Sequence, residues 1–128
     1  MRRCSSAAPS PAGSRARCCS WTTASTSWVS KRPFNAKGVL IRPLAGEHVM
    51  LSYAELGPGT EVATHSHPHE QGGIVLEGEV EFWAGDERHV IRRGDMFMIP
   101  GGVPHGSRAT RRAVLLEAFY PLRQEYLL

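Results

Sequence analysis

The sequence lacks long apolar runs, and outside one short segment it lacks cysteine. No apolar stretch approaches the roughly 20 residues that a membrane helix needs, so we expect no membrane span. The three cysteines are Cys4, Cys18 and Cys19, and residues 33–128 contain none. A disulfide or a thiolate metal ligand is therefore excluded from that part of the chain, which fits a cytoplasmic protein.

Acidic residues are absent from the start of the chain. Residues 1–32 hold six of the 15 basic residues and no acid, whereas residues 33–128 hold nine basic and all 12 acidic residues, a formal balance of −3. The later part therefore shows no basic surface for nucleic acid. Residues 1–32 are rich in Ser, Ala, Thr and Arg and have no helical or strand periodicity. We expect either a disordered basic arm there or a start assigned too far upstream.

The rest of the chain has the pattern of a single all-β domain. A length of 128 residues suits one domain, and we assign that domain to residues 33–128. From Val39 onward, short apolar runs alternate with Gly and Pro every eight to twelve residues, which is typical of a sandwich or barrel. No segment has a sustained helical stripe. The strands expected from this pattern are 39–41, 49–56, 62–67, 73–76, 79–83, 88–91, 96–99 and 112–119.

Three histidines and one glutamine form a pattern that suits a metal site. His65 and His67 stand two apart in an expected strand, so both imidazoles would share one face. Gln71 follows after a proline bends the chain, and His105 comes from a turn about forty residues after the first histidine. Three imidazole nitrogens and one amide oxygen suit a transition ion and leave coordination positions open to a ligand.

The glycines and proline around these four residues complete two spaced motifs. The first comprises Gly59, His65, His67, Gln71 and Gly78, and the second comprises Gly94, Pro100, Gly102 and His105. Over residues 39–126 this spacing resembles the two signature motifs of the cupin superfamily. The resemblance implies a small single-domain cupin, a jelly-roll β-barrel that holds one divalent transition metal ion through His65, His67, Gln71 and His105. The identity of the metal stays open among Ni, Zn, Mn, Fe and Co.

Two positions depart from the superfamily's usual motifs. Gln71 stands where Glu is usual, which removes a negative charge and would leave a bound metal more electrophilic. Ala109 stands where Asn is usual, and we expect that change to affect packing alone. Glu70 is the rival ligand beside Gln71. The spacing to Gly78 favours Gln71, and strand alternation would turn Glu70 away from the site.

A narrower resemblance is carried by three segments: 65–71 (HSHPHEQ), 75–79 (VLEGE) and 117–126 (EAFYPLRQEY). They are similar to the pectin-degradation cupins of the KdgF type, in which an acid, an aromatic and an arginine face the metal pocket. The matching positions are Glu117, Phe119 and Arg123, with Glu117 in place of the usual Asp. This resemblance implies conversion of 4,5-unsaturated uronates from pectin or alginate breakdown to linear keto-uronates. It also implies a sugar acid as the small-molecule substrate, while the wider resemblance to cupins implies a homodimer.

Two catalytic roles are expected at these positions. Glu117 ends an apolar run and must point into a cavity or into solvent, and in a cavity beside a metal it would move a proton. Arg123 would hold a substrate carboxylate with its guanidinium fork, the alternative being a surface salt bridge. Phe119 and Trp83 are expected in the core. Two other functions stay open: a different cupin enzyme, such as a polyketide cyclase or a dioxygenase, and a non-enzymatic cupin that binds a small molecule.

Overall fold

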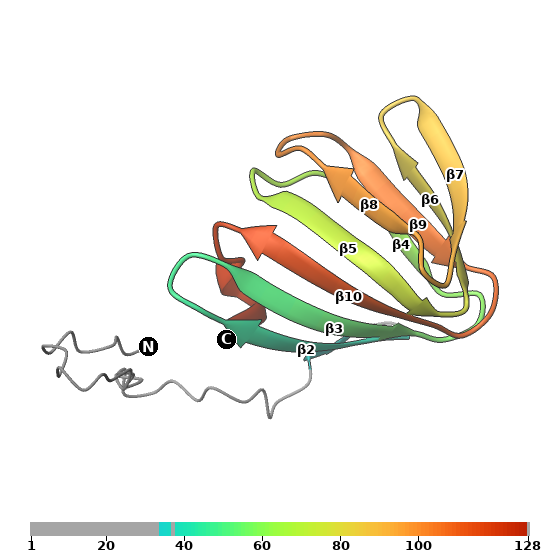
Figure 1. The fold of residues 1–128 in the computed structure, drawn as a ribbon, viewed down its shortest axis with the longest axis horizontal. Coiled ribbons are helices and arrows are strands. Elements are labelled where there is room, and N and C mark those ends of the chain that lie inside the picture. The colour runs from blue at the N-terminus through green and yellow to red at the C-terminus, as the bar shows by residue number, and fades with distance from the viewer. Residues whose placement is uncertain (1–33, 37, 128) are drawn as a thin grey trace, which may run out of the picture. The chain divides into compact units, whose positions relative to one another are not determined.

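The structure, a computed structural model, describes residues 34–36 and 38–127. The described chain consists of strands and one 3₁₀ turn, η1 (Gln124–Leu127) (Figure 1). The strands are β1 (Phe34–Ala36), β2 (Val39–Ala45), β3 (Met50–Leu56), β4 (Glu61–His65), β5 (Glu70–Glu77), β6 (Glu79–Ala84), β7 (Glu87–Arg92), β8 (Met96–Ile99), β9 (His105–Ala109) and β10 (Ala113–Tyr120). The arm expected at residues 1–32 lies outside the described residues.

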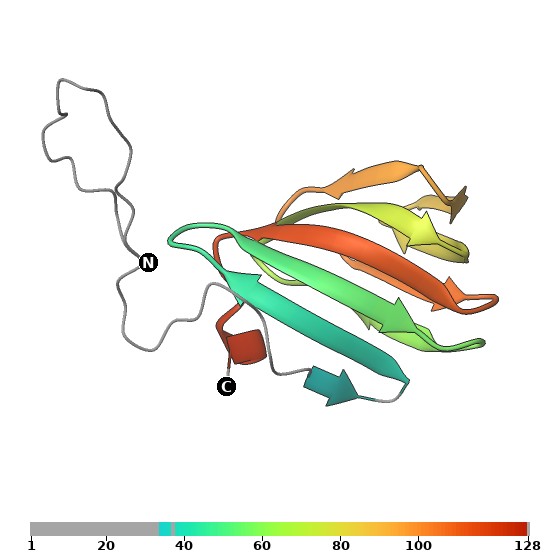
Figure 2. The same ribbon diagram turned by 60° about the horizontal axis from the view of Figure 1, so that its bottom comes forward.

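The strands form two antiparallel sheets in which neighbours are often distant in the sequence. The larger sheet has the order β1-β2-β3-β10-β5-β8, and the smaller has the order β4-β9-β6-β7. Figure 2 shows β2, β3 and β10 running side by side in the larger sheet. This arrangement confirms the all-β jelly-roll fold expected from the sequence. Over the described residues, no helix has the length and apolarity needed to cross a bilayer.

Alternation along the strands separates an inner face from an outer face. In β3, Met50, Ser52 and Ala54 are buried while Leu51 and Tyr53 are exposed, which is the period of two that a strand imposes. The inward residues of both sheets pack together between the layers. The buried core cluster comprises Ile41, Ala54, Leu56, Val75, Val80, Phe82, Ile99, Ala109, Ala113 and Leu115. Ala109, which stands where Asn is usual in cupins, is thus a packed core residue, as expected.

The structure extends the expected strand 39–41 to Ala45 as β2 and adds β1, which was not predicted, and it also corrects the strands near the predicted ligands. β4 ends at His65, so the predicted strand 62–67 is two residues too long, because the chain leaves the sheet before Pro68. β5 begins at Glu70, three residues earlier than predicted. Its two glycines weaken the strand signal, but the segment is paired on both sides, with β10 and β8. β9 was not predicted, because its sequence HGSRA has no apolar run. It is held between β4 and β6 instead.

Gly78 fixes the hairpin between β5 and β6. Its backbone φ is +85°, in the left-handed region that side chains rarely adopt. A Cβ atom at this position would also collide with the carbonyl oxygen of Arg112. The glycine therefore lets the hairpin turn lie directly against the start of β10.

Candidate metal centre and catalytic site

The four predicted ligands converge between the two sheets. His65 ends β4 and His105 begins β9, and these two residues pair directly across the smaller sheet. Gln71 is the second residue of β5 in the larger sheet. The nitrogen atoms of His65, His67 and His105 that could bind a metal all lie within 4.8 Å of one another. The structure thus brings together residues that are up to forty positions apart in the chain.

His67 reaches this cluster by a different route from the one predicted. It lies beyond the end of β4, so strand alternation does not place it beside His65. Instead its carbonyl oxygen accepts a hydrogen bond from the Gly102 N–H at 2.8 Å. Gly101 packs against the carbonyl of Pro68 so closely that no Cβ could fit. The turns of the two sequence motifs are therefore joined, and this contact positions His67 relative to His105.

All three imidazoles are oriented by backbone carbonyls. His65 donates from Nδ1 to the carbonyl oxygen of Ala63 at 2.8 Å, and His105 donates from Nδ1 to Val103 at 2.8 Å. His67 Nδ1 lies 3.1 Å from another carbonyl oxygen, that of residue 69. A carbonyl can only accept, so the proton of each neutral ring belongs on Nδ1. The Nε2 lone pair is then the one available to a metal, a common arrangement at metal centres.

Gln71 is held with its oxygen toward the histidines. Its Nε2 donates to Glu117 Oε2 at 2.6 Å, which fixes the orientation of the amide. Its Oε1 then lies 3.1 Å from Nε2 of His67 and 3.1 Å from Nε2 of His105. Glu70, the rival ligand, is exposed, whereas Gln71 is buried. The amide oxygen therefore faces two imidazole nitrogens in a buried position.

The charge states of these groups show that the cluster fits a cation. Burial, with the positive charge of Arg123 adding to it, lowers the pKa of His67 to about 4, and burial also lowers the pKa of His105. Both rings are thus neutral at neutral pH. Their Nε2 lone pairs and the Gln71 oxygen are all acceptors, and acceptors repel one another unless a positive charge lies between them. A divalent transition ion would supply that charge, and the three histidines with Gln71 would hold it.

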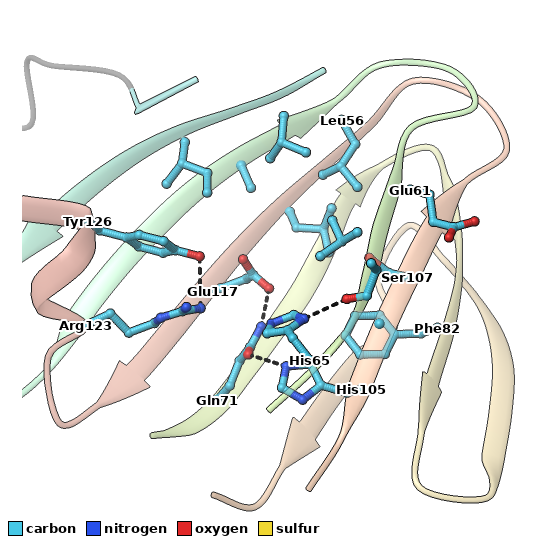
Figure 3. A pocket seen from close by; sticks show the side chains of 17 residues that line it. Leu56, Glu61, His65, Gln71, Phe82, His105, Ser107, Glu117, Arg123 and Tyr126 are labelled. Carbon is cyan, nitrogen blue, oxygen red and sulfur yellow. Dashed lines mark hydrogen bonds between the residues drawn. The ribbon is translucent and has the colours of Figure 1, made fainter. Parts of the chain in front are cut away.

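Glu117 lies beside the cluster on β10 (Figure 3). In the register of the larger sheet Gln71 pairs with Phe119, so Glu117 is its diagonal neighbour on the inner face. Burial raises the pKa of the Glu117 carboxyl to about 7, while the Gln71 hydrogen bond and the charge of Arg123 act in the opposite direction. A cation held by the histidines would act in the same direction as Gln71 and Arg123 and lower the pKa of Glu117. The carboxyl points into the cavity, one of the two placements expected from the sequence.

Arg123 follows β10 and lines the same cavity. Its Nε and Nη2 lie 2.8 Å and 2.6 Å from Glu125 Oε2, and its Nη1 donates to the Tyr126 hydroxyl at 2.9 Å. The guanidinium carbon lies 4.4 Å from the centre of the Tyr126 ring and 5.2 Å from that of Phe119. Arg123 therefore forms an ion pair, the first of its two expected alternatives, at a position that lines the cavity, and the contact with a substrate carboxylate stays a prediction.

Tyr126 is a residue of this site to which sequence analysis assigned no role. It lies in η1, and its backbone N–H donates to the Arg123 carbonyl at 3.1 Å. Residues three apart in a 3₁₀ turn lie over one another, which places the phenol ring against the guanidinium. Burial raises the pKa of Tyr126 to about 12. The available signal was that Tyr126 stands three residues after Arg123, beyond the proline that follows β10. A single 3₁₀ turn, however, has no distinctive sequence pattern.

The cavity that these residues share has a volume of about 280 Å³. Figure 3 shows Gln71, His65 and His105 on one side, with Glu117 between them and Arg123. The remainder of the lining is largely apolar. Of the two aromatic residues expected in the core, Phe119 is fully buried and Trp83 is half-buried, with its ring against Gly106.

Comparison with known proteins relates the chain to one family. A family model described as Cupin domain matches residues 52–119. The curated protein H2HPP isomerase of Bacillus subtilis is 38% identical over 61 residues, which are 47% of this chain and 25% of that protein. The chain therefore spans about a quarter of the length of this curated relative.

Solved structures agree with the fold. An RmlC-like cupin from Shewanella frigidimarina NCIMB 400 is 26% identical, with a TM-score of 0.72 over 76% of this chain and 88% of that one. KdgF from Halomonas sp. is 22% identical, with a TM-score of 0.71 over 77% of this chain and 94% of that one. At that identity the likeness to KdgF shows the fold alone.

Proposed function

The chain belongs to the cupin domain family, and from that premise we propose that it is a metal-dependent enzyme that moves a proton within a small carboxylic acid. The observation that carries this proposal is one juxtaposition. The carboxyl of Glu117 is hydrogen-bonded to Gln71 beside the three histidines, and it shares a cavity with the guanidinium of Arg123. A metal-binding set, a proton-carrying group and an anion-binding group thus surround one space.

Each group has a distinct part in this proposal. A bound divalent ion would act as a Lewis acid that polarises a substrate oxygen and stabilises developing negative charge. Arg123 would bind the substrate carboxylate at the other side of the cavity. Glu117 accepts the Gln71 N–H at Oε2, so Oε1 is the atom at which it would hold and move a proton. Two anchors on either side of Glu117 would orient the substrate for that transfer.

The first candidate substrate is a 4,5-unsaturated uronate, and the resemblance of residues 117–126 to KdgF-type cupins supports it. In that reaction the anomeric hydroxyl loses a proton, the bond between C1 and the ring oxygen breaks, and C4 gains a proton. The product is an open-chain sugar acid with an aldehyde and a ketone, and no atom is gained or lost. The placement of Glu117 between the metal-binding set and Arg123 suits both proton transfers.

The second candidate is isomerisation of a different substrate. The observation that favours it is the 38% identity with H2HPP isomerase over 61 residues.

The test is turnover of unsaturated galacturonate by the full chain loaded separately with Ni, Zn, Mn, Fe and Co. Loss of the absorbance of the conjugated alkene reports the reaction, and Glu117→Gln with unchanged metal content is the matched control. Turnover by the wild type that is lost in the variant supports the uronate candidate. Turnover by both proteins contradicts the role of Glu117. Absence of turnover with every metal excludes the uronate and leaves the second candidate.

A further inference from the structure

The cavity has two chemically different ends. The polar end contains His65, His105, Gln71, Glu117 and Arg123. The other end, which we call the apolar chamber, is lined by Ile41, Ala54, Leu56, Val62 and Leu115, while Glu61 and Ser107 also line the cavity. Figure 3 shows Leu56 across the cavity from Gln71 and His105.

The apolar chamber is built from inward positions of the larger sheet and the adjoining β4. Ile41, Ala54, Leu56 and Leu115 are buried members of the core, and Val62 packs against it. Their side chains offer no hydrogen-bond donor or acceptor. A hydroxyl group that contacts only these five side chains would lose its hydrogen bonds to water without replacement, which costs binding free energy. A substrate with hydroxyls on most of its carbons, such as a sugar acid, is therefore poorly matched to this end.

The size of the cavity allows an apolar group as large as a ring. A cavity of about 150 Å³ lined by aliphatic and aromatic side chains is enough to bind benzene. The cavity of this protein measures about 280 Å³. Room for a ring in the apolar chamber therefore leaves room for a carboxylate and a second oxygen at the polar end.

We infer that the substrate is a small carboxylic acid that bears an apolar ring or branched chain, with the apolar part in the chamber of Ile41, Ala54, Leu56, Val62 and Leu115. This inference rests on the proposed function. It favours an acid other than a bare uronate. The polar head would lie among Glu117, Arg123 and the metal-binding set, and the chamber would determine which acids bind.

The experiment compares three acids by calorimetric titration of the metal-loaded full chain. Lactate and 3-phenyllactate share a carboxylate and a 2-hydroxyl and differ by one phenyl group, while galacturonate represents the sugar acids. Burial of the phenyl group should make 3-phenyllactate bind about 10- to 100-fold more tightly than lactate. Galacturonate should bind no more tightly than lactate. Equal affinities for lactate and 3-phenyllactate, or a preference for galacturonate, would overturn the inference.

Two matched variants show where the phenyl group binds. Ala54→Val adds volume inside the chamber, whereas Ala118→Val makes the same change on the outer face of β10. Ala54→Val should remove most of the gain from the phenyl group, and Ala118→Val should leave the affinities for both acids unchanged. A gain that survives Ala54→Val but disappears in Met98→Lys would place the ligand on the outer face and overturn the inference. Where Ala54→Val fails to fold, the comparison of lactate with 3-phenyllactate on the wild type still tests the preference, and loss of the gain in Met98→Lys still overturns the inference.

Failure of this inference and failure of the proposed function give different results. The titrations measure binding, so they do not depend on turnover. A preference for 3-phenyllactate in a protein that turns over neither candidate substrate supports the chamber and contradicts the enzymatic proposal. Turnover of unsaturated galacturonate without any preference for the phenyl group supports the enzymatic proposal and contradicts the chamber.

Discussion

The inner and outer faces of the larger sheet each depart in part from the usual pattern. Along β10 the inward residues include the carboxyl of Glu117, while the outward residues Leu116 and Tyr120 are apolar or aromatic. The outer face also carries Met96 and Met98 on β8, which are 76% and 68% exposed. Antiparallel strands with one solvated face normally place polar residues outside and apolar residues inside.

Both departures from that pattern carry information. Exposed single hydrophobic residues are common, whereas a buried polar group or a contiguous exposed apolar area calls for an explanation. Inside, the polar groups are explained by their mutual contacts, because Gln71 and Glu117 are hydrogen-bonded and face the histidines. Outside, the apolar residues have no such explanation within one copy of the described chain. The inner face thus contains the candidate site, and the outer face leaves apolar residues exposed.

The largest expected effect comes from removing one of the inward histidines. His105 is 3% exposed and its Nε2 faces the cluster, so His105→Ala should lower the affinity for a divalent metal at least tenfold, since even loss of a partner outside the ligand set costs about 10- to 100-fold. Metal content per chain measures this. His89→Ala, on the exposed β7, is the control and should retain the metal. Equal metal content in both variants would contradict the assignment of His105 as a ligand.

The next largest effect is a difference in the free energy of unfolding between substitutions on the two faces. Leu115 is 3% exposed on the inner face and Leu116 is 37% exposed on the outer face of the same strand. Leu115→Ala should lower the free energy of unfolding by about 2–5 kcal/mol, and Leu116→Ala by less than about 1 kcal/mol. Urea denaturation measures both changes. Equal losses would show that the outer face is packed as tightly as the core, which is the result expected of a face buried against another chain.

Much of this organisation could be predicted from the sequence. The remainder could not be predicted, and the reasons are physical. The spacing of His65, Gln71 and His105 predicts a cluster, because each follows or precedes a turn that glycine or proline marks. The prediction that strand alternation places His67 beside His65 was wrong. The position of His67 depends on a backbone contact with Gly102, which is distant in the sequence. β9 escaped prediction because its pairing partners, and not its own residues, make it a strand.

The apolar chamber could not be predicted for a related reason. Alternation indicates which residues of β3 point inward, but not whether the space that they face is filled. That depends on the distance between the two sheets and on the size of every facing side chain. The role of Glu117 lies between these cases, because an acid at the end of an apolar run predicts a special environment without saying which one.

A third test changes the charge of the inner face and leaves its shape. Glu117→Gln should lower kcat by about 100-fold with little change in KM if Glu117 moves a proton, since the amide cannot do so. Turnover of unsaturated galacturonate, the first candidate substrate, measures it. Glu117→Asp, the residue that KdgF-type cupins usually carry, should retain activity equal to or above that of the wild type. Wild-type kcat in the Gln variant would contradict the catalytic role.

A fourth test concerns the guanidinium at the end of the cavity. Arg123→Ala should raise KM by about 10- to 150-fold and leave metal content unchanged, because one charge-assisted contact contributes roughly 1.5–3 kcal/mol. Glu125→Gln is the matched control: it removes the partner that holds Nε and Nη2 in the free protein but leaves the guanidinium in place. A rise in KM of similar size in both variants would indicate that the ion pair with Glu125, and not a contact with substrate, determines the effect.

The smallest expected effect on stability is also the one that decides what the outer face is. Met98→Lys adds a charge to an exposed position, so the melting temperature of a single copy should change little, by an amount that corresponds to about 0.5 kcal/mol or less.

The homodimer implied by the resemblance stays a prediction, and a second copy would cover the exposed residues of β8 and β10. A lysine desolvated in that interface would oppose association. Light scattering after size-exclusion chromatography should then show a dimer for the wild type and a monomer for Met98→Lys. Val90→Lys, which makes a similar change on exposed β7 of the smaller sheet, should remain a dimer. A dimer that survives Met98→Lys but not Val90→Lys would move the interface to the smaller sheet, and a monomeric wild type would leave the apolar outer face as solvent-exposed surface.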